Sequence, residues 1–274
     1  MGSKKKISRK EQATVISASE AHKLTGAWND IRNNYAKVDS VFSQMGACFS
    51  YQYHAGPEKP SSIHFYLGYD EGENTVYIIA TKYSDDISDT NKDITKIPLQ
   101  ELDIEELLIP SEEPDITDSN TISPLEGNKR IADWNNIHNR REWLNQNIKS
   151  PGEIEAGEKP GVIQAYSVSA KDFDHLDIHK CYFAFRQIKE TKERETVETI
   201  KVLTESEGIR DYKEKKEVSK SKDVRKFFQA DLVVVSLKET KSKEAEQYVK
   251  KVYEDVAGPV PPFKPLGFSL LPPL

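Results

Sequence analysis

The sequence contains little cysteine: Cys48 and Cys181 are the only two thiols in 274 residues. Two thiols cannot form the disulfide framework of a small secreted domain, so we expect a reducing compartment, the cytoplasm. Either thiol could serve as a nucleophile with His54 or His179 as its base. Because nothing in the sequence sets those distances, we interpret both cysteines as small buried hydrophobic side chains.

Long apolar runs are missing as well. No stretch approaches the roughly 18 consecutive apolar residues that suggest a membrane-spanning helix, and the N-terminus lacks the apolar core of a secretory signal. The net charge of −6 gives no reason to expect general affinity for nucleic acid. A protein is therefore the expected partner. The basic arm over residues 1–15 is interpreted as a mobile solubilising tail, with phosphate binding as the alternative.

The motifs of common catalytic sites are also absent. The sequence has no Gly-rich phosphate loop, Gly-x-Ser-x-Gly, His-Glu-x-x-His or Cys-x-x-Cys. The densest group of acids and imidazoles runs from Asp172 to His179 and could serve a metal-assisted hydrolase. However, His175 and His179 share a helix face only if that helix continues, and Ile178 should already enter a strand. We therefore favour a solvated helix end, expect no catalytic, cofactor-binding or metal-binding residue, and keep the hydrolase as the alternative.

What the sequence does contain is a repeat. Eight residues recur at a constant offset of 106 positions: Ile16, Ser17, Glu20, Lys23, Trp28, Asn29, Ile31 and Asn33 return as Ile122, Ser123, Glu126, Lys129, Trp134, Asn135, Ile137 and Asn139. Trp and Asn rarely recur together by chance. An internal duplication is the simplest explanation.

Each copy of the repeat begins as a helix. Ser17 with Glu20, and Ser123 with Glu126, have the spacing of the capping box, in which each side chain bonds to the other's backbone N–H. Apolar residues then follow at helical spacing: Leu24, Trp28, Ile31 and Tyr35 in the first copy, and Ile131, Trp134, Ile137, Leu144 and Ile148 in the second. We interpret the shared Trp as a core anchor and the shared Asn as solvent-facing, rather than the pair as a ligand-stacking site.

Alternation of apolar residues predicts strands in both halves. In the first half we expect a strand over residues 38–43 and a hairpin over residues 63–83 whose sheet is covered on both faces. In the second half we expect strands over residues 162–168, 178–187, 196–204 and 227–237, a charged hairpin tip over 190–195 and a closing helix over 242–256. The expected fold class is α+β: two tandem copies of a helix–strand–helix–β-hairpin unit, with mainly antiparallel sheets.

Charge and proline content suggest the boundaries. Residues 84–120 carry twelve Asp or Glu against Lys92 and Lys96, which is typical of an acidic linker. Inside it, residues 98–110 predict a short helix that either lies back on the first repeat or docks a basic partner. The expected division is a basic arm (1–15), a first repeat (16–83), the linker (84–120), a second repeat with insertions (121–257) and a Pro-rich tail (258–274).

The Pro-rich tail carries five large apolar side chains on an extended backbone: Phe263, Leu266, Phe268, Leu270 and Leu271. In water these side chains gain nothing, so they must cover a groove on this protein or enter one on a partner. We take them as the predicted partner-binding residues. The sequence therefore predicts a non-catalytic protein-interaction or structural module.

Three short motifs resemble those of uncharacterised bacterial proteins, often from Bacteroidetes. These are the helix start with Ile16, Ser17 and Ala21, the strand segment Tyr66-Leu67-Gly68, and the Pro-rich end after Tyr253, where Val260 replaces the cysteine of that group. The resemblance covers about a third of the chain. It implies a shared fold and no particular activity.

Overall fold

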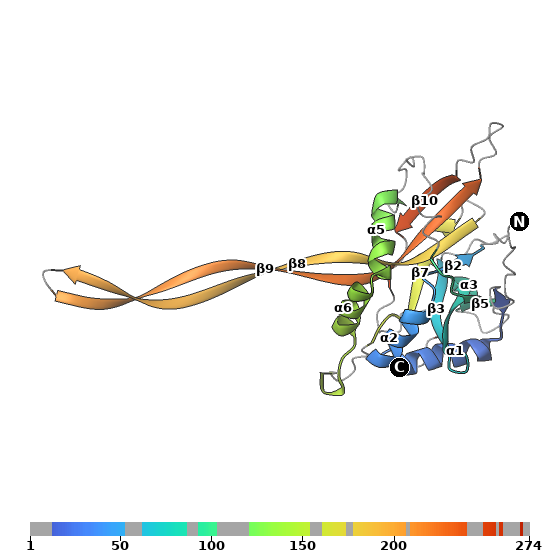
Figure 1. Ribbon diagram of the computed structural model, residues 1–274, viewed down its shortest axis with the longest axis horizontal. Coiled ribbons are helices and arrows are strands. Elements are labelled where there is room, and N and C mark those ends of the chain that lie inside the picture. The colour runs from blue at the N-terminus through green and yellow to red at the C-terminus, as the bar shows by residue number, and fades with distance from the viewer. Residues whose placement is uncertain are drawn as a thin grey trace, which may run out of the picture. The chain divides into compact units, whose positions relative to one another are not determined.

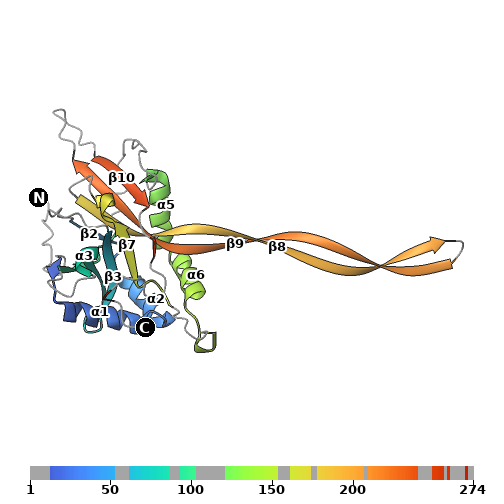
Figure 2. The ribbon, with the colours of Figure 1, turned by 180° about the vertical axis from the view of Figure 1, so that it is seen from behind.

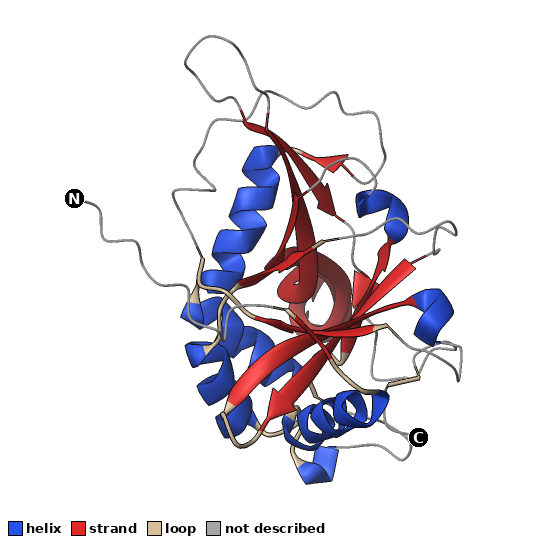
Figure 3. Cartoon of the chain, turned by 90° about the vertical axis from the view of Figure 1, so that its right-hand side faces the viewer, coloured by secondary structure: helices blue, strands red, loops and turns tan. Residues whose placement is uncertain are grey.

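The described part of the chain is an α+β fold with antiparallel sheets, which confirms the predicted fold class (Figures 1 and 3). This computed structural model describes residues 13–52, 62–86, 93–102, 121–153, 161–173, 178–206, 209–239, 249–255, 258–259 and 269–270. The chain forms two compact units, residues Gln187–Phe228 and the remainder, which is called the body below.

Both halves of the sequence begin with a short strand and two helices, and strands follow. The first half contains β1 (Thr14–Val15), α1 (Ala18–Ile31), α2 (Tyr35–Gln44), β2 (Cys48–Tyr51), β3 (Ser62–Asp70), β4 (Thr75–Lys82), the short α3 (Tyr83–Asp86) and β5 (Ile94–Pro98). The second contains β6 (Thr121–Ile122), α5 (Pro124–Asn135), α6 (Ile137–Asn147), η2 (Pro151–Glu153), β7 (Ala165–Ser169), η3 (Ala170–Phe173), β8 (Ile178–Ser206), β9 (Ile209–Glu239), β10 (Val249–Asp255) and β11 (Gly258–Pro259).

Each half contributes strands to the sheet of the other half: β7 and β11 of the second half lie in the first sheet, and β2 of the first half lies in the second. The first sheet has the order β1-β5-β4-β3-β7-β11, and the second has the order β2-β8-β9-β10-β6. Thus β7 of the second half pairs with β3, placing Tyr166 opposite Phe65, and β2 of the first half pairs with β8, placing Phe49 opposite Cys181. Neither half completes its sheet alone. The duplication stays a prediction.

The approach to β7 is held by the end of α1. Trp28 Nε1 donates to the carbonyl of Ile163 (2.8 Å) and Arg32 Nη1 donates to that of Val162 (2.9 Å). The Val162 N–H in turn donates to the carbonyl of Arg32 (3.1 Å). Gly161 precedes this contact with φ of +117°, and a Cβ there would lie 2.9 Å from the Arg32 carbonyl oxygen. Only glycine suits that position, because both its φ and its closeness to backbone exclude a side chain.

Aromatic rings from both halves fill the interior. Trp28 and Trp134 are each 1% exposed, and the Phe42 ring centroid lies 5.8 Å from the first and 5.6 Å from the second. The two sheets meet through rings as well, since Phe49 of β2 lies 5.2 Å from Phe65 of β3. The interpretation of the repeated Trp as a core anchor is confirmed.

The helix starts agree with the sequence in part. Ser17 and Ser123 each accept the N–H of the Glu three residues later, at 3.2 Å, so the serine half of both capping boxes is confirmed. The repeated Asn differs from the prediction. Asn29 Oδ1 accepts from Gln164 Nε2 (2.9 Å) and so bonds to the other half of the chain.

The strand predicted over residues 38–43 is wrong, because these residues belong to α2. Asn34 caps this helix by accepting the N–H of Lys37 (3.1 Å), and Val38, Val41 and Phe42 are its buried residues. Their spacing of three and four is helical, but two β-branched residues in a short run suggested a strand. Similarly, Ile137 does not extend α5. It begins α6 after the Asn136 cap and is 38% exposed.

Three further expectations differ from the structure. The charged tip predicted over residues 190–195 lies within β8, which continues to Ser206. The closing helix predicted over 242–256 is strand β10 over Val249–Asp255, where it pairs with residues 233–239 of β9; residues 242–248 lie outside the described part. The predicted acidic linker includes β5, which lies between β4 and β1. In each case pairing with a distant strand overrides local composition.

The hairpin of β3 and β4 agrees with its prediction. Nearly every residue of both strands is buried, on both faces. Helix α1 covers one face, where Leu24 packs with Tyr66 and Ile79, and the interior aromatic rings cover the other. In the second sheet, α5 lies beside β10 (Figures 1 and 2). No helix in the described part of the chain is long and apolar enough to cross a bilayer.

The buried tryptophans make a first prediction. Trp28→Ala or Trp134→Ala should lower the free energy of unfolding by roughly 3–5 kcal/mol, because each leaves a large cavity between the two halves. Urea denaturation measures this. Leu125→Ala, on the same helix as Trp134 but 82% exposed, is the control and should change stability by less than about 0.5 kcal/mol. Equal effects of Trp134→Ala and Leu125→Ala would contradict the core assignment.

Candidate functional site

A buried carboxylate collects four hydrogen bonds at the end of α3. Asp86 Oδ2 accepts from His64 Nδ1 (2.6 Å) and from the Tyr66 hydroxyl. Its other oxygen, Oδ1, accepts from the backbone N–H of Ser269 (3.1 Å) and from the Ser269 hydroxyl (2.6 Å). His64 and Tyr66 reach the same carboxylate because residues two apart in a strand share a face. An ionised carboxylate can only accept, so His64 carries the proton of its bond at Nδ1.

The bonds around Asp86 keep it charged. Burial raises the pKa of this carboxyl, but the hydrogen bonds from His64, Ser269 and Tyr66 outweigh burial and hold the pKa below its usual value. Burial and the Asp86 charge together raise the pKa of the Tyr66 hydroxyl far above its usual value. The pair is therefore an ionised carboxylate and a neutral phenol at any ordinary pH.

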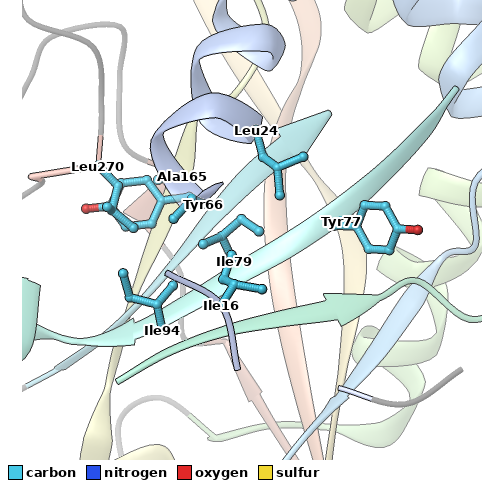
Figure 4. Packing of buried hydrophobic residues seen from close by; sticks show 9 residues of the cluster. Ile16, Leu24, Tyr66, Tyr77, Ile79, Ile94, Ala165 and Leu270 are labelled. Atoms are coloured by element: carbon cyan, nitrogen blue, oxygen red, sulfur yellow. The ribbon is translucent and has the colours of Figure 1, made fainter. Parts of the chain in front are cut away.

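The same site binds the C-terminal segment. Leu270 is 0% exposed and packs among Tyr66, Ala165 and Leu24 (Figure 4). The Thr25 hydroxyl donates to its carbonyl at 2.7 Å. Of the two destinations considered for the tail, Leu270 occupies a groove on this protein itself. The other predicted partner-binding residues, Phe263, Leu266, Phe268 and Leu271, lie outside the described part, and their role stays a prediction.

The order of hydrogen bonds in this cluster favours a structural role over a catalytic one. The bonds run from the Ser269 hydroxyl to the Asp86 carboxylate and from that carboxylate to the His64 imidazole. A serine nucleophile needs the imidazole between hydroxyl and carboxylate, so that the hydroxyl proton has a base to receive it. Here the carboxylate occupies the middle position. We therefore assign the cluster to fastening Ser269 and Leu270 against α1 and β3.

Both cysteines are buried, as the sequence suggested, and form no disulfide. Burial raises the pKa of the Cys181 thiol well above its usual value, and the nearby Cys48 adds to this. Cys48 lies opposite Tyr182 in the β2–β8 pair, whereas Cys181 lies opposite Phe49. The two thiols therefore belong to opposite faces of the sheet. A protonated, buried thiol is a poor nucleophile.

The structure describes only part of the predicted acid–imidazole group. His179 is buried in β8, and its ring centroid lies 5.1 Å from that of Phe173 in an edge-to-face contact. Asp174, His175 and Asp177 lie outside the described residues. Within the described residues, no three His, Cys, Asp or Glu side chains are grouped so as to hold a metal ion. The metal-assisted hydrolase stays a prediction, and the burial of His179 gives it no support.

A second buried acid escaped the sequence reasoning. Asp231 is almost fully buried in β9 and accepts from Arg186 Nη2 (3.0 Å) and Arg130 Nη1 (3.3 Å). Arg130 also bonds to Glu126 Oε1 at 2.7 Å, so the group fastens α5 to the sheet. One signal was present: an Asp directly before the apolar run 232–235 must be buried with a cation. The sequence alone does not show which arginines provide that cation, because the fold brings Arg130 and Arg186 to Asp231.

The body also has a small hollow of about 230 Å³ beside β2, β4 and β5. Tyr51, Thr81, Thr95, Lys82 and Asp93 are among the residues that line it. The lining has one cation, Lys82, and one anion, Asp93, so its charge favours neither anionic nor cationic ligands. The hollow could admit a small polar molecule, and nothing in its lining defines one.

The second compact unit is a two-stranded ribbon. Within Gln187–Phe228, β8 and β9 run side by side and twist about each other (Figure 1). β2 pairs with β8 only over residues 179–182, and β10 pairs with β9 only over 233–239. In the described part of the chain, the outer edges of both ribbon strands therefore have no strand partner. Such edges present rows of free N–H and C=O groups.

Comparison with known protein families, with curated proteins and with solved structures finds no match to this chain. The resemblance to the bacterial group therefore stays an expectation.

Asp86 makes stability depend on pH. Because its folded pKa lies below that of an unfolded Asp, about 3.9, its contribution is fully present above that pH and is lost as the pH falls through the folded pKa. Asp86→Asn should therefore unfold at lower urea at neutral pH, and its difference from the unmodified chain should shrink toward about pH 2. Asp85→Asn, the neighbouring residue in α3, is the control. A difference that stays constant with pH would contradict the assignment.

Leu270 provides a separate test of tail docking. Leu270→Ala should lower the free energy of unfolding by about 2–5 kcal/mol, because it empties a fully buried position. Thermal or urea denaturation measures this. Val15→Ala, at a position 75% exposed, should have little effect. If Leu270→Ala is as harmless as Val15→Ala, the tail does not dock on its own protein in solution.

Proposed function

We propose that this protein is a non-catalytic protein-interaction module, and that the ribbon Gln187–Phe228 is its partner-binding arm. The observation that carries the proposal is the pair of open strand edges along the ribbon. Each strand contributes about 20 residues, which at about 3.3 Å per residue corresponds to roughly 65 Å. An isolated two-stranded ribbon is only marginally stable in water and needs further strands or a covering surface.

The chemistry of the ribbon favours a protein partner. Open edges bind an extended strand of another protein through backbone hydrogen bonds. Over residues 187–228 the sequence has twelve Lys or Arg and ten Asp or Glu, so positive and negative charges nearly balance. Binding to nucleic acid depends on an excess of cations that neutralise phosphates. A nearly neutral ribbon lacks that excess.

The polar groups of the body support a non-catalytic role. Asp86 fastens the tail, Asp231 fastens α5, and the thiols are buried. The two carboxylates each hold distant segments of the chain together. The apolar tail residues Phe263, Leu266, Phe268 and Leu271 remain part of the proposal as a second partner-binding segment.

Removing the ribbon tests the proposal. In the variant, an Asn-Gly turn joins Ile188 to Phe227 and replaces the residues between them, since Asn-Gly suits a two-residue hairpin. The body should melt within a few degrees of the full chain, because the ribbon forms a compact unit of its own. Binding to protein partners, read by affinity purification with mass spectrometry and by sedimentation, should be lost.

The control for ribbon removal is Leu125→Ala, an exposed change on the body that should retain every partner. If the folded, ribbon-less chain keeps the same partners and the same mass in solution as the full chain, the ribbon is not the binding arm.

A further inference from the structure

The two outer edges of the ribbon differ in charge. Over residues 187–206 of β8 the sequence has four Lys or Arg and five Asp or Glu. Over residues 209–228 of β9 it has eight Lys or Arg and four Asp or Glu. Neither stretch contains proline or glycine, so every residue keeps its backbone N–H. Natural edge strands are kept from pairing by lysine or proline. The β9 edge has such protection from its excess of cations, and the β8 edge does not.

We propose that the β8 edge of the ribbon pairs antiparallel with the β8 edge of a second copy of this chain. The inference rests on the proposed function, in which the ribbon is the partner-binding arm, and names the partner. The product is a sheet of four strands in the order β9-β8-β8-β9. It exceeds the three strands that independent stability requires. Both outer edges of this sheet are basic β9 edges, which repel a further copy and limit the assembly to a dimer.

Symmetry restricts the register of this pairing. The two copies of β8 are related by a two-fold axis perpendicular to the sheet. A rotation about this axis leaves each side chain on the same face of the sheet in both copies. Opposite residues share a face, and the axis must therefore pass through a residue paired with its own copy. Nearly all of residues 187–206 are paired only if Thr196 or Val197 lies at the axis. Val197 places Lys189 opposite Glu205 and Glu193 opposite Lys201, with no like charges opposite each other.

The alternatives are less favourable. With Thr196 at the axis, Arg194 opposite Glu198 is the one pair of unlike charges. Pairing through β9 brings like charges opposite each other in both of its central registers, between two strands that each carry an excess of cations. With Val218 at the axis, Arg210 lies opposite Lys226 and Lys216 opposite Lys220. These two pairs of like charges offset most of the attraction of three pairs of unlike charges, Asp211 with Arg225, Lys213 with Asp223 and Glu214 with Lys222. With Ser219 at the axis, Lys213 lies opposite Arg225 and Lys216 opposite Lys222. Like charges directly opposite each other destabilise a strand pair.

A cysteine at the axis tests the register. Opposite residues of an antiparallel pair have Cα atoms about 4.5–5.5 Å apart, within the range that a disulfide spans. Val197→Cys should therefore give a disulfide-linked dimer in nearly full yield on mild oxidation of the full chain. Cys48 and Cys181 are buried and do not compete. Thr191→Cys is the control, because residue 191 lies opposite residue 203 and about 40 Å along the strand from its own copy.

Charge exchange tests the edge. Lys201→Glu places two acids opposite each other on both sides of the axis and should weaken the dimer roughly tenfold in sedimentation equilibrium. Adding Glu193→Lys to Lys201→Glu exchanges the charges and should restore the dimer. Lys213→Glu makes the same charge change on β9 and should leave the dimer intact. Melting of the body serves as the folding check for every variant.

The results separate this inference from the proposed function. A chain that sediments as a monomer, or Thr191→Cys that crosslinks as well as Val197→Cys, overturns the β8 dimer. So does failure of the exchanged charges to restore it. If a monomeric chain still loses another bound protein when the ribbon is removed, the proposed function stands without the dimer. If removal of the ribbon changes neither mass nor partners, both are overturned.

Discussion

The exchange of strands between the two halves is the constraint on which the body depends. β7 and β11 extend the sheet of the first half, and β2 extends the sheet of the second. For this to happen, the chain before β7 must reach the end of α1, where Trp28 and Arg32 bind the carbonyls of Ile163 and Val162. Arg32 remains a cation there even though burial lowers its pKa to about 10. The two halves of the body are therefore one cooperative unit rather than two independently folded domains.

The buried charged groups in the body hold together segments that are far apart in the sequence. Burying an ionised group is costly unless hydrogen bonds and opposite charges replace its water. Asp86 meets this condition with four hydrogen bonds, and Asp231 with two arginines. Each group joins segments far apart in the sequence, Asp86 to Ser269 and Asp231 to Arg130. Such contacts form only when the correct segments meet, so they select one arrangement of the chain. This explains why the most perturbed titratable groups need not mark a catalytic centre.

The body and the ribbon differ in how the N–H and C=O groups of their strands find hydrogen-bond partners. In the body, strands have neighbours, helices cover the sheets, and aromatic rings occupy the interior. In the ribbon, β8 and β9 have each other and open edges on the outside. Free backbone groups on a strand edge have to bond to water or to another strand. This contrast, rather than any reactive side chain, directs the functional argument toward association with protein.

Local sequence patterns determined what depends on neighbours along the chain. The spacing of Ser17 and Glu20 predicted a helix start, the alternation in β3 and β4 predicted a hairpin, and the repeated Trp predicted two buried anchors. The apolar side chains of the tail predicted a groove, and the structure shows one for Leu270. The fold class followed from the same patterns.

Only the tertiary structure decided which distant segments pair. The spacing around Val38 allowed a helix as well as a strand, and the stretch around Val252 became a strand because β9 was available beside it. The groove for Leu270, the bonds of Asp86 and the arginines of Asp231 join residues up to 245 positions apart. No local pattern encodes such partners, because the free energy of a buried hydrogen bond depends on both groups being present after the chain has packed.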